Sequence, residues 1–68
     1  MQVKLQQSGY RIVDDAPLSI QMSGHGMYCI EHYEPKWDAW AQVYPDDGSC
    51  DINYDRVLDK FKELVNGR

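Results

Sequence analysis

The feature that most constrains this fold is an apolar stripe near the C-terminal end of the sequence. Its members recur at intervals of three and four residues, the period of an α-helix; they are Val57, Leu58, Phe61, Leu64 and Val65. Asp51 or Asn53 suits the N-terminal cap, and Gly67 suits the left-handed residue that ends a helix. The pattern predicts an amphipathic helix of about four turns, which must bury its stripe against another element.

Two runs of aromatic and β-branched residues, 28–33 and 38–44, predict the sheet that receives this helix. Residues 34–37 form the expected hairpin loop, and a four-residue loop sets Tyr33 opposite Asp38. The helix then covers the face made of Tyr28, Ile30, His32, Ala39, Ala41 and Val43. The opposite face of the sheet, called the open face below, is expected to hold Met27, Cys29, Glu31, Tyr33, Asp38, Trp40, Gln42 and Tyr44.

The N-terminal part of the sequence supplies the remaining expected strands. Leu18, Ile20 and Met22 alternate with polar residues, which predicts a strand joined to residue 27 by a loop at 24–26. Residues 2–13 predict an outer strand, interrupted at Ser8-Gly9, whose register stays open. We therefore predict one α+β domain over residues 1–68. Its order is β-β-β-β-α: a small antiparallel meander of three to four strands, then one C-terminal amphipathic helix on one sheet face.

Length and charge restrict the classes of function. A chain of 68 residues has room for one modest core, and its net charge of −4 argues against direct binding of nucleic acid. The longest uncharged stretch, 16–30, is largely polar and broken by proline and glycine, so no membrane span is expected. The N-terminus lacks the pattern of a secretory signal, and we expect a cytoplasmic protein with reduced thiols.

Metal chemistry is the first alternative weighed. His25, Cys29, His32 and Cys50 are residue types that bind zinc, but their spacing along alternating strands does not bring them together. Asp51, Asn53 and Asp55 match the first three ligand positions of a calcium loop. The sixth position is Arg56 instead of glycine, and the twelfth is Lys62 instead of a carboxylate. We predict no metal and no cofactor.

An enzyme is the second alternative weighed. The sequence contains no nucleophile elbow, phosphate loop or dinucleotide fingerprint. A sheet with one helix also has little volume for a pocket that excludes water. We therefore predict a non-enzymatic protein.

Two surfaces remain as candidate binding sites. On the open face, Trp40, Tyr33, Tyr44 and Met27 would act as anchors, and Glu31 and Asp38 would border them. On the helix, Asp51, Asp55, Asp59 and Glu63 recur every four residues, or about 6 Å, which is close to the spacing of phosphates along DNA. Arg56 and Lys60 lie beside these acids and weaken the mimicry.

These features favour a small acidic module that binds another protein, and we expect the partner to have a basic surface. A stoichiometric inhibitor, such as a phage-encoded anti-defence protein of the anti-CRISPR type, would suit this size and charge. One alternative is a regulatory module associated with nucleic acid through Lys4, Arg11 and Lys36, or a DNA mimic. A small metal-binding protein or enzyme is the third. A homodimer through the open face is also compatible with the pattern.

Overall fold

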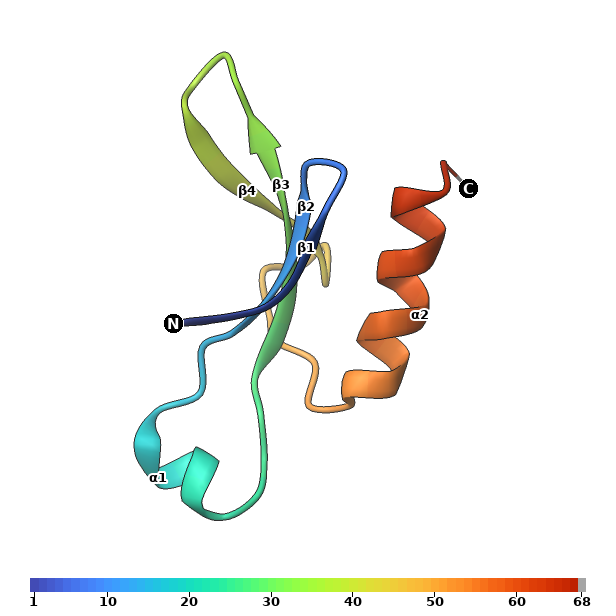
Figure 1. Ribbon diagram of the computed structural model, residues 1–68. Coiled ribbons are helices and arrows are strands. Elements are labelled where there is room, and N and C mark those ends of the chain that lie inside the picture. Colours follow the sequence, from blue (N-terminus) through green and yellow to red (C-terminus); the bar gives the residue numbers. More distant parts are fainter. Residues whose placement is uncertain (68) are drawn as a thin grey trace.

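A computed structural model describes residues 1–67 and shows an antiparallel sheet with one long helix on one face (Figure 1). The elements are β1 (Gln2–Gln7), β2 (Tyr10–Asp14), α1 (Leu18–Met22), β3 (Tyr28–Glu34), β4 (Ala39–Tyr44) and α2 (Tyr54–Val65). The strands follow one another across the sheet in the order β1-β2-β3-β4. The predicted α+β meander with a C-terminal helix is confirmed.

The core lies between α2 and the two central strands. Ile12 of β2 and Ile30 of β3 are fully buried and pack against Val57 and Phe61 of α2. Helix α2 begins after Asn53, whose side-chain oxygen accepts a hydrogen bond from the backbone N–H of Arg56 at 3.1 Å. The stripe that the sequence predicted is therefore the surface by which the helix docks.

The first hairpin has a two-residue turn. Gln7 pairs with Tyr10, and the turn residues Ser8 and Gly9 both have positive φ, 55° and 82°. Turns with this handedness match the right-handed twist of paired strands. The turn makes residues 2–14 two strands instead of one interrupted strand.

The strand predicted around Leu18–Met22 is wrong, because these residues form the short helix α1. Its first turn is closed by the carbonyl of Pro17, which accepts from Ile20 at 3.0 Å and from Gln21 at 3.1 Å. Strand β2 already occupies the edge of β3 that the predicted strand would have used. The segment 15–27 therefore leaves the sheet, and all five residues of α1 are exposed.

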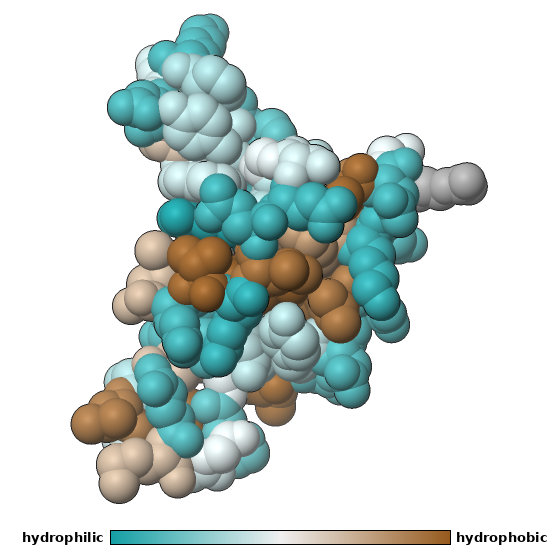
Figure 2. Space-filling model, viewed as in Figure 1, coloured by the Kyte–Doolittle hydropathy of each residue, from teal (hydrophilic) through white to brown (hydrophobic). Residues whose placement is uncertain are grey.

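Both ends of this excursion are fastened at Asp14. The side chain of Asp14 accepts from the backbone of Ala16 at 3.0 Å and from that of Met27 at 3.1 Å, and Asp15 donates to the Met27 carbonyl at 3.0 Å. These bonds form a neck below which α1 extends away from the sheet. Figure 2 shows the apolar side chains of this region at the lower left, apart from those in the middle of the molecule.

The predicted register of β3 and β4 is also wrong, by two residues. Tyr33 pairs with Trp40 and not with Asp38, which belongs to the turn and has a positive φ of 47°. Because side chains alternate with a period of two, this shift leaves Tyr33 and Trp40 on the open face. The turn keeps the predicted length of four residues but lies at 35–38, and the β3–β4 hairpin extends past the other strands (Figure 1).

A bulge in β4 changes the face of its last residue. Glu31 pairs with Gln42, whereas Ile30 pairs with Tyr44, so Val43 is an extra residue. Tyr44 consequently lies on the helix-covered face and packs against the core. Its predicted place on the open face is wrong.

Within residues 1–67, no helix has the length and apolarity needed to cross a membrane.

Candidate protein-binding surface

Four side chains from three adjacent strands meet on the open face near the β3–β4 hairpin. Arg11 of β2 pairs with Glu31 of β3, and Tyr33 of β3 pairs with Trp40 of β4. Arg11 and Glu31 alternate with the buried Ile12 and Ile30, and Tyr33 and Trp40 lie on the same face as Glu31, so the strand period directs all four away from the core. We call Arg11, Glu31, Tyr33 and Trp40 the platform.

The platform is held together by charge and ring contacts. Arg11 Nε donates to Glu31 Oε1 at 2.7 Å, and Arg11 Cζ lies 4.1 Å from the centroid of the Trp40 ring. The rings of Tyr33 and Trp40 are 5.4 Å apart between centroids and inclined by 60°. The side chains of Arg11 and Glu31 are only 15% and 20% exposed, so this ion pair is partly shielded from water. The contacts order two aromatic rings that remain half-exposed.

The tip of the hairpin carries a second indole. Trp37 is 71% exposed, and Lys36 Nζ lies 5.2 Å from the centroid of its ring. Just below the tip, the hydroxyl of Tyr33 donates to Asp38 Oδ1. This hydrogen bond to a carboxylate raises the pKa of Tyr33, because the protonated phenol is the donor. Asp38 therefore holds Tyr33 in place from the turn and does not lie on the strand.

The other end of the open face is covered by the chain itself. Gln42 Nε2 donates to the carbonyls of Pro45 at 2.9 Å and Ser49 at 2.8 Å, which fastens the loop 45–50 to β4. Cys29, predicted on this face, is buried with its sulfur 3.8 Å from the Ser49 carbonyl. The accessible part of the face is therefore limited to the hairpin end.

Tyr44 and Asp51 belong to a hydrogen-bond network in which Asp51 is buried and Tyr44 is half-buried, instead of a binding surface. The Tyr44 hydroxyl donates to Asp51 Oδ2 at 2.7 Å, and Arg56 donates to both oxygens of Asp51, each at 2.7 Å. The backbone of Asn53 adds a bond at 2.9 Å. The Arg56 guanidinium, assisted by these other donors, holds the pKa of Asp51 well below its usual range despite burial. This network fixes the connection into α2.

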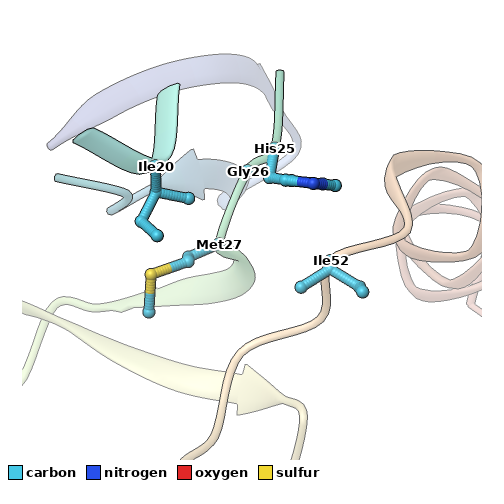
Figure 3. A pocket seen from close by; sticks show the side chains of 5 residues that line it. All are labelled: Ile20, His25, Gly26, Met27 and Ile52. Carbon is cyan, nitrogen blue, oxygen red and sulfur yellow. The ribbon is translucent and has the colours of Figure 1, made fainter. Parts of the chain in front are cut away.

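Met27 also lies apart from the platform. It lines an apolar hollow of about 390 Å³ together with Ile20, His25, Gly26 and Ile52, between the α1 excursion and the start of α2 (Figure 3). Gly26 is required here, because a Cβ at this position would overlap the ring of Tyr28. Met27 and Trp40, predicted to share one surface, are therefore separated by the covered part of the sheet.

The acidic row on α2 is shorter than the sequence predicted. Asp55, Asp59 and Glu63 are exposed along the helix, but Asp51 is buried in its network. Lys60 Nζ lies 3.8 Å from Glu63 Oε2, which partly neutralises the end of the row. Three carboxylates remain on a solvent-facing surface.

The residues considered for metal binding do not meet. His32 contacts Tyr10 with ring centroids 4.5 Å apart and the rings inclined by 42°, and its Nδ1 lies 3.1 Å from Glu34 Oε1. His25 lines the apolar hollow. Over the described part of the chain, positions 1–67, no three His, Cys, Asp or Glu side chains are grouped closely enough to hold a metal ion.

Comparison with known proteins gives no relative on which to base an assignment: no family model, no curated protein and no solved structure matches this chain.

Two members of the candidate surface were missed by the reasoning from sequence. Arg11 lies between Tyr10 and Ile12, and the alternation of that strand already directed it to the opposite face from Ile12. Its contact with Trp40, however, could not be predicted without the register of β2 against β3. Trp37 was assigned to the hairpin loop and given no further role, although an indole in a polar turn is itself a signal of binding.

Proposed function

We propose that this protein is a non-enzymatic module that binds another protein through the platform and the neighbouring hairpin tip. The observation that carries the proposal is the projecting hairpin, which bears a 71% exposed Trp37 in its turn and the ordered rings of Tyr33 and Trp40 on its strands. Tryptophan, tyrosine and arginine are the residue types that most often dominate the energy of protein interfaces. The surface combines all three.

The order of the platform supports this role. Side chains that are already fixed lose little conformational freedom when a partner arrives, so more of the contact energy contributes to affinity. Arg11 is fixed by Glu31 and by the Trp40 ring, and Tyr33 is fixed by Asp38. Such an arrangement suits an anchor better than it suits general solvation.

The charge distribution supports a basic partner. The protein carries a net charge of −4, and exposed carboxylates occupy both the 45–50 loop and α2, at Asp46, Asp47, Asp55, Asp59 and Glu63. Complementary charge accelerates encounter and limits wrong partners. A module of this kind would act by occupying the partner's surface, as stoichiometric inhibitors do. A cytoplasmic location is part of the same proposal.

The test compares four versions of the protein as bait. Wild type, Trp37→Ala, Trp40→Ala and Leu18→Ala are immobilised, and proteins retained from lysate are quantified by mass spectrometry. Leu18 is the matched control, because it is 70% exposed on α1 and remote from the platform. We expect a partner that is lost from both Trp variants and kept by Leu18→Ala, and that then binds purified wild type with a 1:1 stoichiometry by calorimetry.

Two outcomes contradict the proposal. Equal retention of every captured protein by all four baits would show that the platform is not an anchor. A monomer–dimer equilibrium that Trp40→Ala abolishes would assign the platform to a second copy of this chain.

The acidic row on α2 supports a second candidate function, mimicry of nucleic acid. Asp55, Asp59 and Glu63 remain exposed and spaced by one turn, which is the observation in its favour. The row is shortened by the burial of Asp51 and neutralised in part by Lys60, so we rank it below the platform.

A further inference from the structure

The two cysteines of this protein lie in contact although they are 21 positions apart in the sequence. Their Sγ atoms are 3.5 Å apart and unbonded. Cys29 is buried on β3, whereas Cys50 is half-buried at the end of the 45–50 loop. One thiol is therefore shielded from reagents and the other can be reached.

The backbone beside them has the geometry of paired strands. Tyr28 and Asp51 exchange two backbone hydrogen bonds, of 2.8 and 2.9 Å, and form an antiparallel bridge. In an antiparallel ladder, the next pair along is a non-hydrogen-bonded pair with Cα atoms about 4.5 Å apart and side chains on one face. Cys29 follows Tyr28 and Cys50 precedes Asp51, so the two cysteines occupy that next position.

This position satisfies the requirement for a covalent link. Disulfides join residues whose Cα atoms are about 4.4–6.8 Å apart, and the two sulfur atoms already touch. Bond formation then needs a small adjustment of the side chains and no rearrangement of the sheet.

We propose that Cys29 and Cys50 form a reversible intramolecular disulfide, with a low-molecular-weight disulfide as the oxidant, and that this bond locks the 45–50 loop onto the sheet. Without the bond, the loop is held to the sheet by the two hydrogen bonds of Gln42 and by the weaker contact of Cys29 Sγ with the Ser49 carbonyl. With it, the loop and the Tyr28–Asp51 bridge become one closed unit that leads directly into α2. This inference is independent of the proposed binding function.

The order of attack follows from accessibility. The Cys50 thiol loses its proton to solvent, and the thiolate attacks one sulfur of the external disulfide, whose S–S bond breaks and releases one thiolate. Cys29 then loses its proton and attacks Cys50 Sγ, which expels the second thiolate. The two released thiolates take up two protons, so two protein thiols are oxidised while one external disulfide is reduced to two thiols.

The second step is expected to be the slow one. Burial, with the contact to Cys50 adding to it, raises the pKa of the Cys29 thiol. Little Cys29 thiolate is then present at neutral pH. The step still proceeds, because it is intramolecular and Cys50 Sγ, the attacked atom, is held next to Cys29.

Oxidised glutathione serves as the probe. The folded protein is incubated with it, trapped with N-ethylmaleimide and analysed by intact mass. We expect a monomer that lacks two hydrogen atoms and carries neither glutathione nor maleimide. Its midpoint of thermal unfolding should rise by about 10 °C or more, because the bond restrains a long loop in the unfolded chain. Dithiothreitol should reverse both changes.

Single variants distinguish the two thiols. Cys29→Ser should stop at the first step and retain one glutathione on Cys50. Cys50→Ser should stay unmodified while folded and react only in denaturant, because Cys29 is buried. If Cys29→Ser does not fold, wild type and Cys50→Ser still provide the test.

Three results would overturn the proposal. The first is accumulation of a glutathione adduct of the wild type, and the second is formation of a covalent dimer. The third is an oxidised monomer whose midpoint of thermal unfolding equals or lies below that of the reduced protein.

Discussion

The two faces of the sheet use the same strands for different purposes. On the helix-covered face, Ile12 and Ile30 are fully buried beneath Val57 and Phe61. On the open face, the residues adjacent to these in the same strands, Arg11 and Glu31, form a partly exposed ion pair beside Trp40. The first face is held by apolar burial, and the second by an ion pair, a cation–π contact and a tilted contact between two aromatic rings.

This difference teaches where stability and binding can be changed separately. Apolar burial against α2 supplies most of the driving force for folding, since it removes the apolar side chains of the core from water. The platform makes fewer buried contacts, so its residues can be exchanged at smaller cost to the fold. Substitutions on the helix-covered face should therefore lower stability, whereas substitutions on the open face should lower binding affinity.

The largest expected effect is on the helix-covered face. Phe61→Ala leaves a cavity in the centre of the core and should cost about 3–5 kcal/mol of unfolding free energy. Because a small domain has a total of about 5–10 kcal/mol, the variant should be largely unfolded. Circular dichroism during a thermal melt measures this. A variant with the wild-type midpoint would contradict the docking of α2.

The network at the start of α2 should come second. Asp51→Asn removes the charge that Arg56 and Tyr44 contact, and should cost about 2–3 kcal/mol because hydrogen bonds to charged groups are lost. Chemical denaturation at neutral pH measures the loss. Unchanged stability would show that the network contributes nothing.

Acidification should distinguish the same variant from wild type. The pKa of Asp51 is lowered on folding, so its contribution is complete above the unfolded value of about 3.9 and is lost as the pH falls below it. Wild type should therefore lose more stability between about pH 4 and pH 2 than Asp51→Asn does. Parallel pH profiles for the two proteins would contradict the assignment.

A substitution on the open face should lower binding affinity and leave stability nearly unchanged. Trp40→Ala should weaken binding of the partner by about 2 kcal/mol or more, as for a hot-spot aromatic. Its thermal midpoint should stay close to that of wild type, since the indole is only half-buried. Calorimetric titration and a melt of the same sample make the comparison. A folded variant with full affinity would remove the platform from consideration.

The smallest effect is expected from the exposed acids of α2. Reversing Asp55 and Asp59 to Lys should slow association with a basic partner, and the effect should fade at high salt because exposed charges are screened beyond roughly 10 Å at 0.1 M. Association rates measured at two salt concentrations test this. Complete loss of binding, with Trp40→Ala harmless, would favour mimicry of nucleic acid over the platform.

The helix-covered face was the more predictable of the two. The stripe on α2 keeps the helical period along the whole helix. Leu58, Phe61 and Leu64 are three positions apart, and only a helix places such residues on the same side. Leu18–Met22 misled the prediction because three alternating residues fit a strand as well as one turn of helix. Contacts outside this segment exclude the strand, because β2 occupies the edge of β3 and Asp14 turns the chain away from the sheet.

The open face depended on details that a single sequence does not display. The two-residue error in the hairpin register left the faces of Tyr33 and Trp40 unchanged, whereas the extra residue Val43 moved Tyr44 to the core. A bulge has no reliable sequence signal, since it is set by how both ends of the strand are held. The approach of Cys50 to Cys29 likewise follows from a long-range bridge between Tyr28 and Asp51.

The neck at Asp14 makes the excursion 15–27 a natural site for insertion. The backbones of Asp15 and Met27 are already hydrogen-bonded to each other, so the two ends stay together whatever the chain does between them. Exposed segments with closely spaced ends tolerate changes in length better than segments that carry core contacts. A lineage, or a protein engineer, could therefore exchange α1 for a turn or for a foreign peptide, and the sheet would keep its strand order and its platform.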